Sequence, residues 1–590
     1  MTALFTPMSI GGVEIRNRVV MPSMTTRLAD GEGYVTDATI AYFEARAHGG
    51  TGLVTVEMAS PERAGRHRAR ELGIYDDRFL PGLKRLVNAL HHAGARASIQ
   101  LGHAGGHTRE DICGEPPIAP SAIPHFVYEV TGETITPLEM TRERIERTTR
   151  AFVEAAKRAR EAGFDCVELH VAHGYLLSQF LCPEENRRRD EYGGALANRA
   201  RISLDILRRM KAELPGFPVV FRLSVEDFFP TGLQFSEGFQ VAKWAASAGA
   251  DAIHVSAGHY RSRPTAHRMI PPMAYPEGVF LDYAQTVKMA VSVPVIAVGR
   301  LGNPAVAMAA VDSGRADFVA LGRALLADPD WVNKVRSGVP VRRCLACNKC
   351  VDEMRGGEPI GCLVNPTAAR ETEFAAATGM PKGERICVIG AGPAGLSYAS
   401  LLAHSNQVTV IERAQLPGGA FRYAGKAPQF QEVEAIPESL NTFIGELERA
   451  CVQAGVALKY GVDVGEYPDV LRDYDRIVIA TGAKYRLGSG TLLRWLLDHG
   501  WGKSWPMRRL FSSVRFRNWF YYRARKATGN AYRALAGDGQ KITVIGDAAR
   551  AGKGKEAIES AFRAAYWDPP ALDLSVPQLA SARRHRSPVT

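Results

Sequence analysis

The sequence has no run of about 18 uncharged apolar residues, the length that a membrane-spanning helix needs. Its opening residues, MTALFTPMSIGG, lack the basic and apolar stretches of a secretory signal. Both absences predict a cytoplasmic protein. At 590 residues the chain is too long for one hydrophobic core, so we expect three or four units of about 150 residues each.

Cysteine is scarce outside one short segment. The chain has nine cysteines, and four of them (Cys344, Cys347, Cys350 and Cys362) crowd into residues 344–362. In a cytosolic chain such crowding predicts metal ligation rather than disulfides. Three thiolates from one turn-rich segment, joined by a distant fourth, are typical of a [4Fe–4S] cluster. Zinc is the alternative, because four cysteines also suit tetrahedral Zn²⁺.

Acidic residues are almost missing from residues 491–533. This stretch carries ten Lys or Arg against the single acid Asp498, and it therefore holds +9 of the net charge of +11. Four of the seven tryptophans fall here as well. Because the basic charge is local, the composition argues against a general nucleic-acid-binding surface.

Eight short apolar runs between about residues 18 and 345 predict eight buried parallel strands. Amphipathic helical stretches separate the runs, and each ends near a glycine. The runs are VVMP (19–22), GLVTVE (52–57), ASIQL (97–101), CVELH (166–170), PVVFR (218–222), AIHVSAG (252–258), PVIAVGR (294–300) and FVALGR (318–323). A (β/α)₈ TIM barrel over residues 1–343 is the simplest closure, and an open doubly wound sheet is the alternative.

A second α/β fold begins at about residue 384, after a cysteine segment and linker (344–383). VIGAGPAGLS follows a predicted strand and opens a helix, and Glu412 ends the next strand. This pattern predicts a Rossmann-like dinucleotide-binding domain, with Gly390, Gly392 and Gly395 at a pyrophosphate and Glu412 at a ribose hydroxyl. We assign residues 384–490 and 534–570 to this domain, residues 491–533 to a basic aromatic insertion, and residues 571–590 to a C-terminal tail.

The end of the fourth predicted barrel strand carries three residues suited to catalysis. His170 ends the strand, and His173 and Tyr175 follow in the loop, at the end where barrel enzymes place their active sites. Two imidazoles can hydrogen-bond one carbonyl oxygen, and a phenol nearby can donate a proton. The three residues together predict a catalytic site.

The segment VELHVAHGYLLSQFL resembles the active-site strand of the old yellow enzyme family of FMN ene-reductases. VMPSMTT (20–26), SIQLGHAG (98–105), VVFRLS (219–224) and GRALLADPDW (322–331) agree with further parts of that family, and the resemblance covers residue 5 to about 345. It implies that His170 and His173 hold a substrate carbonyl and that Tyr175 protonates the double bond.

The resemblance also implies where FMN binds. Gln100 is expected at the pyrimidine edge, and Arg222 beside N1 and the C2 carbonyl, where a cation stabilises the reduced ring. A strand-end salt bridge is the alternative reading of Arg222. The phosphate is expected at Gly299, Arg300, Gly322 and Arg323, and the isoalloxazine at Pro22, Ser23 and Met24. His259 matches a histidine that assists protonation in dienoyl-CoA reductases, or it is simply a polar loop residue.

The order of barrel, cysteines and dinucleotide fold resembles the 2,4-dienoyl-CoA reductase and trimethylamine dehydrogenase group, which implies FMN, a [4Fe–4S] cluster and FAD. RIVIATGA (476–483) and ITVIGDAA (542–549) resemble later FAD-binding stations, with Asp547 at the ribityl chain. Family members insert a whole NAD(P)-binding unit between these stations. Here only 58 residues intervene and they contain no GxGxxG, so the NAD(P) subdomain is expected to be missing.

These observations predict an ene-reductase that acts on a small α,β-unsaturated carbonyl compound or thioester. An amine dehydrogenase or demethylase and an electron-transfer subunit are the alternatives. Met24 and His170 speak against the amine enzyme, because trimethylamine dehydrogenase has a flavin-linked Cys and a Tyr at these places. We expect a homo-oligomer that binds no nucleic acid. The segment 491–533 is expected to dock a redox protein or an anionic membrane surface, which would place the protein at the membrane periphery, or to fold over the FAD cleft with solvated arginines.

Overall fold

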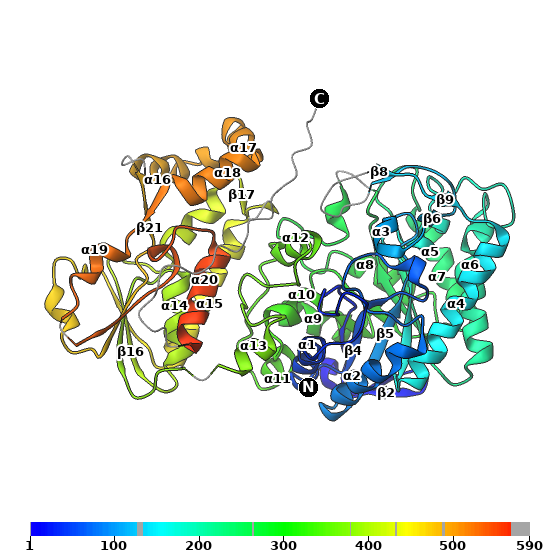
Figure 1. The fold of residues 1–590 in the computed structure, drawn as a ribbon, viewed down its shortest axis with the longest axis horizontal. Helices are drawn as coiled ribbons and strands as arrows, with labels where there is room; N and C mark the ends of the chain where they lie inside the picture. The colour runs from blue at the N-terminus through cyan, green and yellow to red at the C-terminus, as the bar shows by residue number, and fades with distance from the viewer. Residues whose placement is uncertain are drawn as a thin grey trace. The chain divides into compact units, whose positions relative to one another are not determined.

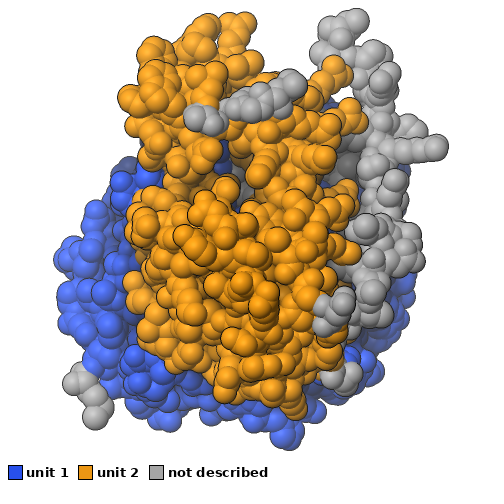
Figure 2. All heavy atoms as spheres, turned by 90° about the vertical axis from the view of Figure 1, so that its left-hand side faces the viewer, with its two compact units in different colours: residues 1–376, 427–439 blue, residues 377–426, 440–590 orange. Residues whose placement is uncertain are grey.

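The computed structural model describes residues 2–126, 134–261, 265–377, 379–430, 433–486, 490–537 and 539–567. The predicted tail, 571–590, lies outside them. The chain forms two compact units, residues 1–376 with 427–439 and residues 377–426 with 440–590 (Figures 1 and 2). The cysteine segment belongs to the first unit. Among the described residues, no helix has the length and apolar character needed to cross a membrane.

A closed barrel of eight parallel strands forms the first unit (Figure 1). Each of the eight apolar runs supplies one strand, so the barrel prediction is confirmed and the open sheet is excluded. The strands are β3 (Val19–Met21), β4 (Leu53–Ala59), β5 (Arg96–Leu101), β10 (Cys166–Val171), β11 (Val219–Ser224), β12 (Ala252–Ser256), β13 (Val295–Ala297) and β14 (Phe318–Ala320).

Amphipathic helices follow most barrel strands. In α2 (Leu80–His92) the residues Leu83, Leu86, Val87 and Leu90 recur at helical spacing and are buried. The other long helices of this unit are α1 (Asp37–His48), α4 (Arg142–Glu161), α6 (Leu196–Glu213), α7 (Phe235–Ser247), α8 (Leu281–Lys288) and α9 (Pro304–Asp312). The shorter ones are α3 (Glu110–Cys113), α5 (Leu176–Leu181), α10 (Gly322–Ala327), α11 (Trp331–Arg336), α12 (Lys349–Arg355) and α13 (Glu371–Ala375).

Short strands decorate the barrel. The antiparallel pair β1 (Met8–Ile10) and β2 (Val13–Ile15) places Ile10 and Ile15 against the apolar layer of the barrel interior. Two further pairs join β6 (Ile118–Ala119) with β9 (Leu138–Glu139) and β7 (His125–Phe126) with β8 (Thr134–Ile135). These latter pairs arise in the long connection after β5.

The barrel interior changes from apolar to polar along the strands. Cys166, Val220 and Ala252 belong to one buried apolar cluster. Because side chains alternate along a strand, Glu168, Arg222 and His254 point to the same interior, one step nearer the carboxyl ends. Arg222 is in register with His170 on one side and with His254 on the other. The sequence alternation therefore builds a charged layer just below the catalytic mouth.

The second unit has a five-stranded parallel sheet in the order β19-β16-β15-β20-β23. Its strands are β15 (Arg385–Ile389), β16 (Gln407–Glu412), β19 (Ala457–Tyr460), β20 (Arg476–Ile479) and β23 (Lys541–Val544). This order is that of a doubly wound Rossmann fold, which confirms the predicted class. Helices α14 (Pro393–Leu402), α15 (Pro437–Gln453) and α20 (Gly554–Tyr566) accompany the sheet.

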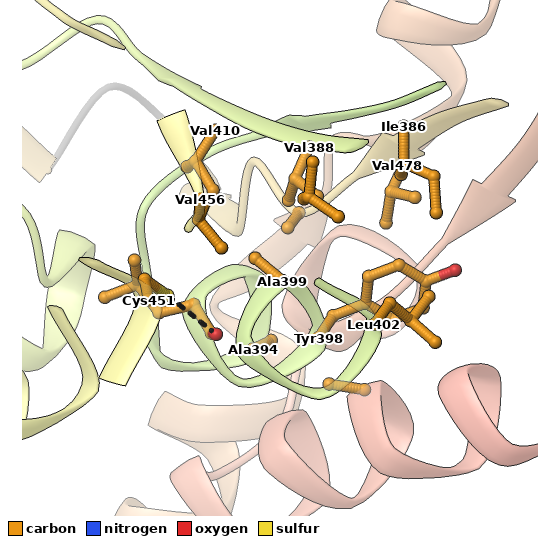
Figure 3. Close-up of a cluster of buried hydrophobic side chains, with 14 of the residues drawn as sticks. Ile386, Val388, Ala394, Tyr398, Ala399, Leu402, Val410, Cys451, Val456 and Val478 are labelled. Atoms are coloured by element: carbon orange, nitrogen blue, oxygen red, sulfur yellow. Dashed lines mark hydrogen bonds between the residues drawn. The ribbon is translucent and has the colours of Figure 1, made fainter. Parts of the chain in front are cut away.

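The core of this unit packs α14 on the sheet. Figure 3 shows Ile386, Val388 and Val478 from the strands above Ala399 and Leu402 of the helix. The buried thiol of Cys451 donates to the Leu396 carbonyl at 3.2 Å. A small antiparallel pair, β17 (Gln429–Phe430) with β18 (Val433–Glu434), belongs to the connection between β16 and β19.

The basic segment leaves and rejoins the sheet through one hairpin. Strands β21 (Ala483–Tyr485) and β22 (Arg525–Ala527) pair antiparallel, and the Thr481 and Thr528 hydroxyls lie 2.7 Å apart beside them. Between the strands lie α16 (Gly490–Asp498), α17 (Trp505–Ser512) and α18 (Val514–Asn518), which group together (Figure 1). Helix α19 (Gly529–Arg533) leads back to β23. The described part of this segment contains no parallel strand pair, so it builds no second Rossmann unit.

Candidate active site

The predicted catalytic residues meet at the carboxyl end of β10. His173 and Gly174 both adopt positive φ, +65° and +80°. A Cβ on Gly174 would lie 2.5 Å from the His259 ring, so the turn requires glycine. The turn brings the His170 and His173 ring centroids to 5.3 Å and those of His170 and Tyr175 to 5.0 Å.

A cavity of about 230 Å³ opens beside this turn and lies wholly within the first unit. It collects most of the predicted site residues from distant parts of the sequence. Those that line it are Pro22, Ser23, Met24, Gln100, His170, His173, Tyr175, Arg222, Gly299, Arg300, Gly322, Arg323, Cys344 and Cys350. The expected flavin residues, the catalytic residues and two of the cluster cysteines therefore share one space.

The buried carboxylate of Glu168 organises the floor of the cavity. Gln100 Nε2 donates to it at 2.7 Å, His254 Nδ1 lies 2.6 Å away, and Arg222 Nη1 lies 3.5 Å away. Burial alone would raise the pKa of Glu168, but His254 and Arg222 outweigh burial and bring it to about 2. The residue thus stays ionised, and it holds the Arg222 cation at the cavity wall. Arg222 makes its strand-end ion pair and lines the cavity as well.

The two catalytic-site imidazoles are neutral near pH 7. Burial and the Arg222 cation lower the pKa of His170 to about 3, and they hold that of His173 well below its usual value. His173 Nε2 lies 2.7 Å from the Ser256 hydroxyl. His170 Nδ1 is buried and has no hydrogen-bond partner among the described residues. A ligand oxygen in the cavity would supply the partner that a buried ring nitrogen needs.

Tyr175 lies against two residues that sequence reasoning missed. Its hydroxyl is 3.0 Å from His67 Nδ1, and its ring centroid is 5.7 Å from that of Tyr260. Burial, followed by the Tyr260 charge, raises the pKa of Tyr175 well above its usual value. Burial would also raise the pKa of Tyr260, but Arg68 and Arg355 bring it down to about 8. The only sequence signal for His67 and Tyr260 is that each follows the end of a barrel strand.

His259 differs from the other predicted catalytic residues because it does not line the cavity. It is fully buried, and its Nε2 is 3.1 Å from Glu185 Oε2. Its backbone pairs with that of His173, and its ring packs against Gly174 of the catalytic turn. The structure therefore brings His170, His173 and Tyr175 together but leaves His259 behind them.

The expected phosphate residues line the same cavity. Gly299 has φ +111° and Arg300 has φ +54°, so the chain after β13 turns sharply there. Arg300 Nη1 donates to the Met273 carbonyl at 3.1 Å. Arg323 donates to the Pro271 carbonyl at 2.8 Å and to the Asn348 side chain. Arg323 thus connects the expected phosphate residues to the cysteine segment.

The four cysteines gather beside this cavity. Cys347, Cys350 and Cys362 are buried and Cys344 is half-buried. Burial raises the pKa of Cys347 to about 12, and the nearby thiols of Cys344 and Cys362 add to the rise. Burial also raises the pKa of Cys362, and Cys344 is close enough to that thiol to add to the rise. Four neighbouring thiols from this segment are the ligand set that a [4Fe–4S] cluster needs.

The dinucleotide residues of the second unit occupy the expected turn. A Cβ on Gly390 would lie 2.6 Å from the Ala480 carbonyl, and one on Gly395 would lie 2.0 Å from that of Gly390. Gly392 caps α14. The Glu412 carboxylate accepts from the backbone amide of Ala391 at 2.8 Å. These close approaches explain why the loop is built from glycine, and they fit the pyrophosphate turn of an FAD site.

Asp547 lies within the last predicted FAD station (542–549), three residues after the end of β23. Its carboxylate accepts from Arg525 Nη1 at 2.7 Å and from the Gly552 amide at 3.1 Å. Burial raises the pKa of Asp547, although Arg525 opposes the rise. An arginine of the basic segment therefore contacts the expected ribityl-binding residue.

A barrel with this mouth, joined to a dinucleotide fold, defines a flavin-dependent oxidoreductase. Residues 3–342 match the NADH:flavin oxidoreductase / NADH oxidase family, and the chain belongs to that family. Residues 388–435 match an NAD(P)-binding Rossmann-like domain. The family match supports FMN in the barrel, and the residues present fit a [4Fe–4S] cluster and FAD at the two other sites.

Three curated relatives align with 82% of this chain. An NADH oxidase of Thermoanaerobacter brockii is 37% identical over 493 residues, 73% of its own length. A cinnamate reductase of Clostridium sporogenes is 32% identical over 515 residues, 74% of its length. An N,N-dimethylglycine/sarcosine dehydrogenase of Chromohalobacter salexigens is 32% identical over 495 residues, 69% of its length. All three are longer than the aligned region.

The whole two-unit fold has a counterpart among solved structures. A 2-naphthoyl-CoA reductase superposes with a TM-score of 0.84, covers 96% of this chain and 99% of its own, and is 23% identical. At this identity the likeness concerns the fold. It agrees with the predicted fold class, a barrel followed by a Rossmann-like domain.

Proposed function

We propose that this flavin oxidoreductase reduces the C=C bond of an α,β-unsaturated carbonyl compound or thioester. The observation that carries the proposal is a pair of neutral imidazoles beside a protonated phenol in one cavity. The names of two similar proteins, a cinnamate reductase and a 2-naphthoyl-CoA reductase, support this class of substrate.

The residues divide the work between binding and proton transfer. His170 and His173 each offer a ring N–H to the substrate carbonyl oxygen, which draws electron density from the alkene. Bound FMN would supply the reducing electrons at the β-carbon. Tyr175 keeps its proton until the α-carbon requires it, because its pKa is high. His67, 3.0 Å from the phenol oxygen, orients the hydroxyl and lies where it can return a proton.

Amine oxidation is the second candidate function, and one relative named as an N,N-dimethylglycine/sarcosine dehydrogenase favours it. A carbonyl-binding imidazole pair has no evident task in that reaction. The two candidates separate in a simple experiment. Chemically reduced enzyme should transfer its electrons to cinnamate-type enones, whereas oxidised enzyme mixed with secondary and tertiary amines should stay oxidised. The reverse outcome would establish the amine enzyme.

The double variant His170→Ala/His173→Ala tests the carbonyl site directly. Phenols bind in such sites through their oxygen, so loss of two hydrogen-bond donors should weaken phenol binding about 10–100-fold. Titration of the long-wavelength charge-transfer absorbance measures the affinity. The control is His91→Ala/His92→Ala, which changes two histidines of α2 outside the cavity. Unchanged phenol affinity in the double variant would refute the site.

A further inference from the structure

A cluster of five buried side chains lies outside the cavity, behind the catalytic turn. His107 follows β5, His125 belongs to β7, Cys182 ends α5, Glu185 follows Cys182, and His259 follows β12. All five are at most 4% exposed. Three connections, those that follow β5, β10 and β12, therefore bring metal-type ligands to one place.

The ligand atoms of this cluster are close enough to share one ion. One ligand atom each from His107, His125 and Glu185 lie within 4.8 Å of one another. Cys182, Glu185 and His259 form a second such triad around the same carboxylate. Glu185 Oε1 is 3.4 Å from His125 Nδ1, and Glu185 Oε2 is 3.1 Å from His259 Nε2. Glu185 is thus the centre of the cluster.

Several of these buried atoms lack a hydrogen bond. His107 Nε2 and both ring nitrogens of His125 have no partner of hydrogen-bond geometry among the described residues. Folded proteins rarely leave buried polar atoms in this condition, and a bound ion is one of the usual reasons. The concentration of such atoms at one point therefore indicates a ligand.

The side-chain types suit a cation. Imidazole nitrogens and carboxylate oxygens are common ligands of divalent transition metals.

We propose that His107, His125 and Glu185 bind one divalent transition-metal ion, with Zn²⁺ the best match for nitrogen and carboxylate ligands. The Cys182 thiol, in the triad that shares Glu185, offers a further ligand at the same carboxylate. Imidazole and carboxylate ligands are typical of zinc.

Such an ion would set the shape of the catalytic turn. The Gly174 backbone rests against the ring of His259, which pairs with Glu185, and Tyr175 is the next residue. His107 also contacts Tyr260, with ring centroids 5.6 Å apart, and Tyr260 contacts Tyr175. A metal here would fix the loops that carry the proton donor without touching the substrate.

Crystallography at two wavelengths tests the proposal on the full-length protein. Diffraction data collected above and below the zinc absorption edge, from crystals grown with zinc, should show one anomalous peak among His107, His125 and Glu185 that vanishes below the edge. Iron at the four cysteines scatters on both sides of the edge, so it serves as the internal reference. A water-sized peak without anomalous signal at this place would overturn the proposal.

Metal analysis of variants gives an independent readout. His125→Ala and the more conservative Glu185→Gln should each lower bound zinc at least tenfold while iron and flavin contents stay unchanged. The control Cys113→Ser alters a buried cysteine outside the cluster and should keep its zinc. Equal zinc content in the three variants and the parent protein would refute the site.

A separate observation concerns the surface of the basic segment, residues 491–533. Its apolar and aromatic side chains face solvent, from 39% exposure for Tyr522 to 68% for Trp505. The exposed members are Leu492, Trp495, Trp501, Trp505, Leu510, Val514, Trp519 and Tyr522. The exposed cations Arg494, Arg508, Arg509, Arg515, Arg523, Lys526 and Arg533 lie among them. The single acid, Asp498, pairs with Lys426 at 2.6 Å.

We propose that this surface binds an anionic lipid membrane. Tryptophan rings and apolar side chains settle at the lipid headgroup level, and surrounding cations attract acidic headgroups. Helix α16 has one buried apolar face and one exposed apolar face. Leu497 is buried, whereas Leu492 and Trp495 on the same helix are exposed.

Vesicle flotation decides between a lipid membrane and an acidic protein partner. The protein should float with phosphatidylglycerol vesicles and not with phosphatidylcholine vesicles. Arg508→Glu/Arg509→Glu should reduce flotation at least tenfold, and so should Trp501→Ser/Trp505→Ser. Lys84→Glu/Arg85→Glu changes two exposed cations of α2 and should float like the parent protein. Failure of the parent protein to float with anionic vesicles at low salt would refute membrane binding and leave the acidic protein partner.

Discussion

Tyr175→Phe is expected to slow alkene reduction by about 10²–10⁴-fold, the usual contribution of a positioned general acid. Phenylalanine keeps the ring packing against His170 and Tyr260 but removes the one hydroxyl that is protonated and lies 3.0 Å from His67. The measurement is stopped-flow reoxidation of chemically reduced enzyme by an enone. Flavin reduction itself should change little, because the phenol takes no part in it.

Tyr192→Phe is the matched control, since Tyr192 is a partly buried tyrosine of the same unit that does not line the cavity. It should react like the parent protein. If Tyr175→Phe retained full reoxidation rates with several enones, another group would have to donate the proton. Tyr260, with a pKa of about 8, would then be the next residue to test.

Cys347→Ser is expected to abolish the iron–sulfur cluster and, with it, electron exchange between the two flavins. Anaerobically purified parent protein should contain about four iron per chain, and the variant almost none. The barrel should stay folded and keep its FMN, because the eight strands precede the cysteines in sequence and form their own core. Iron analysis and the visible absorbance of the cluster measure the loss.

The control for this experiment is Cys451→Ser, which changes a buried thiol in the second unit. It should keep a full complement of iron. Zinc that is present in the parent protein and disappears in Cys347→Ser would contradict the cluster assignment. Zinc that persists in Cys347→Ser belongs elsewhere, and the cluster of His107, His125 and Glu185 would account for it.

The barrel was predictable because each strand is a continuous apolar run, which only a strand buried on both faces tolerates. The polar layer of the barrel interior was harder to predict from the sequence. Glu168 lies within the run CVELH, where its neighbours mark a strand but nothing marks the three partners that the carboxylate meets across the barrel. Partners on other strands are set by register, which the sequence of one strand does not contain.

His170, His173 and Tyr175 could be grouped from the sequence because they are neighbours in it, and the structure brings their rings together. His67 and Tyr260 were missed because their roles depend on the folded positions of two loops far apart in the chain. For His259 the sequence suggested a residue of the site that the folded chain does not place in the cavity. Its place after β12 suggested catalysis, whereas the fold turns its ring toward Glu185 and away from the cavity. The residues of the cluster that contains His259 come from three connections of the barrel, and no spacing in the sequence predicts that they meet.

The pairing of β21 with β22 makes the basic segment a self-contained insertion in the second unit. The basic segment begins after β21 and ends before β22, and these two strands are paired, with Ala483 opposite Ala527. The segment is therefore joined to the five-stranded sheet through two neighbouring strands. The Thr528 hydroxyl, which donates to the Gly482 carbonyl at 2.7 Å, fastens them. An insertion of another length and function can stand between β21 and β22 without a change in the strand order of the sheet. Exchange of this segment would therefore change the binding partner, a soluble coenzyme or a lipid surface, and leave the active site in the barrel unaltered.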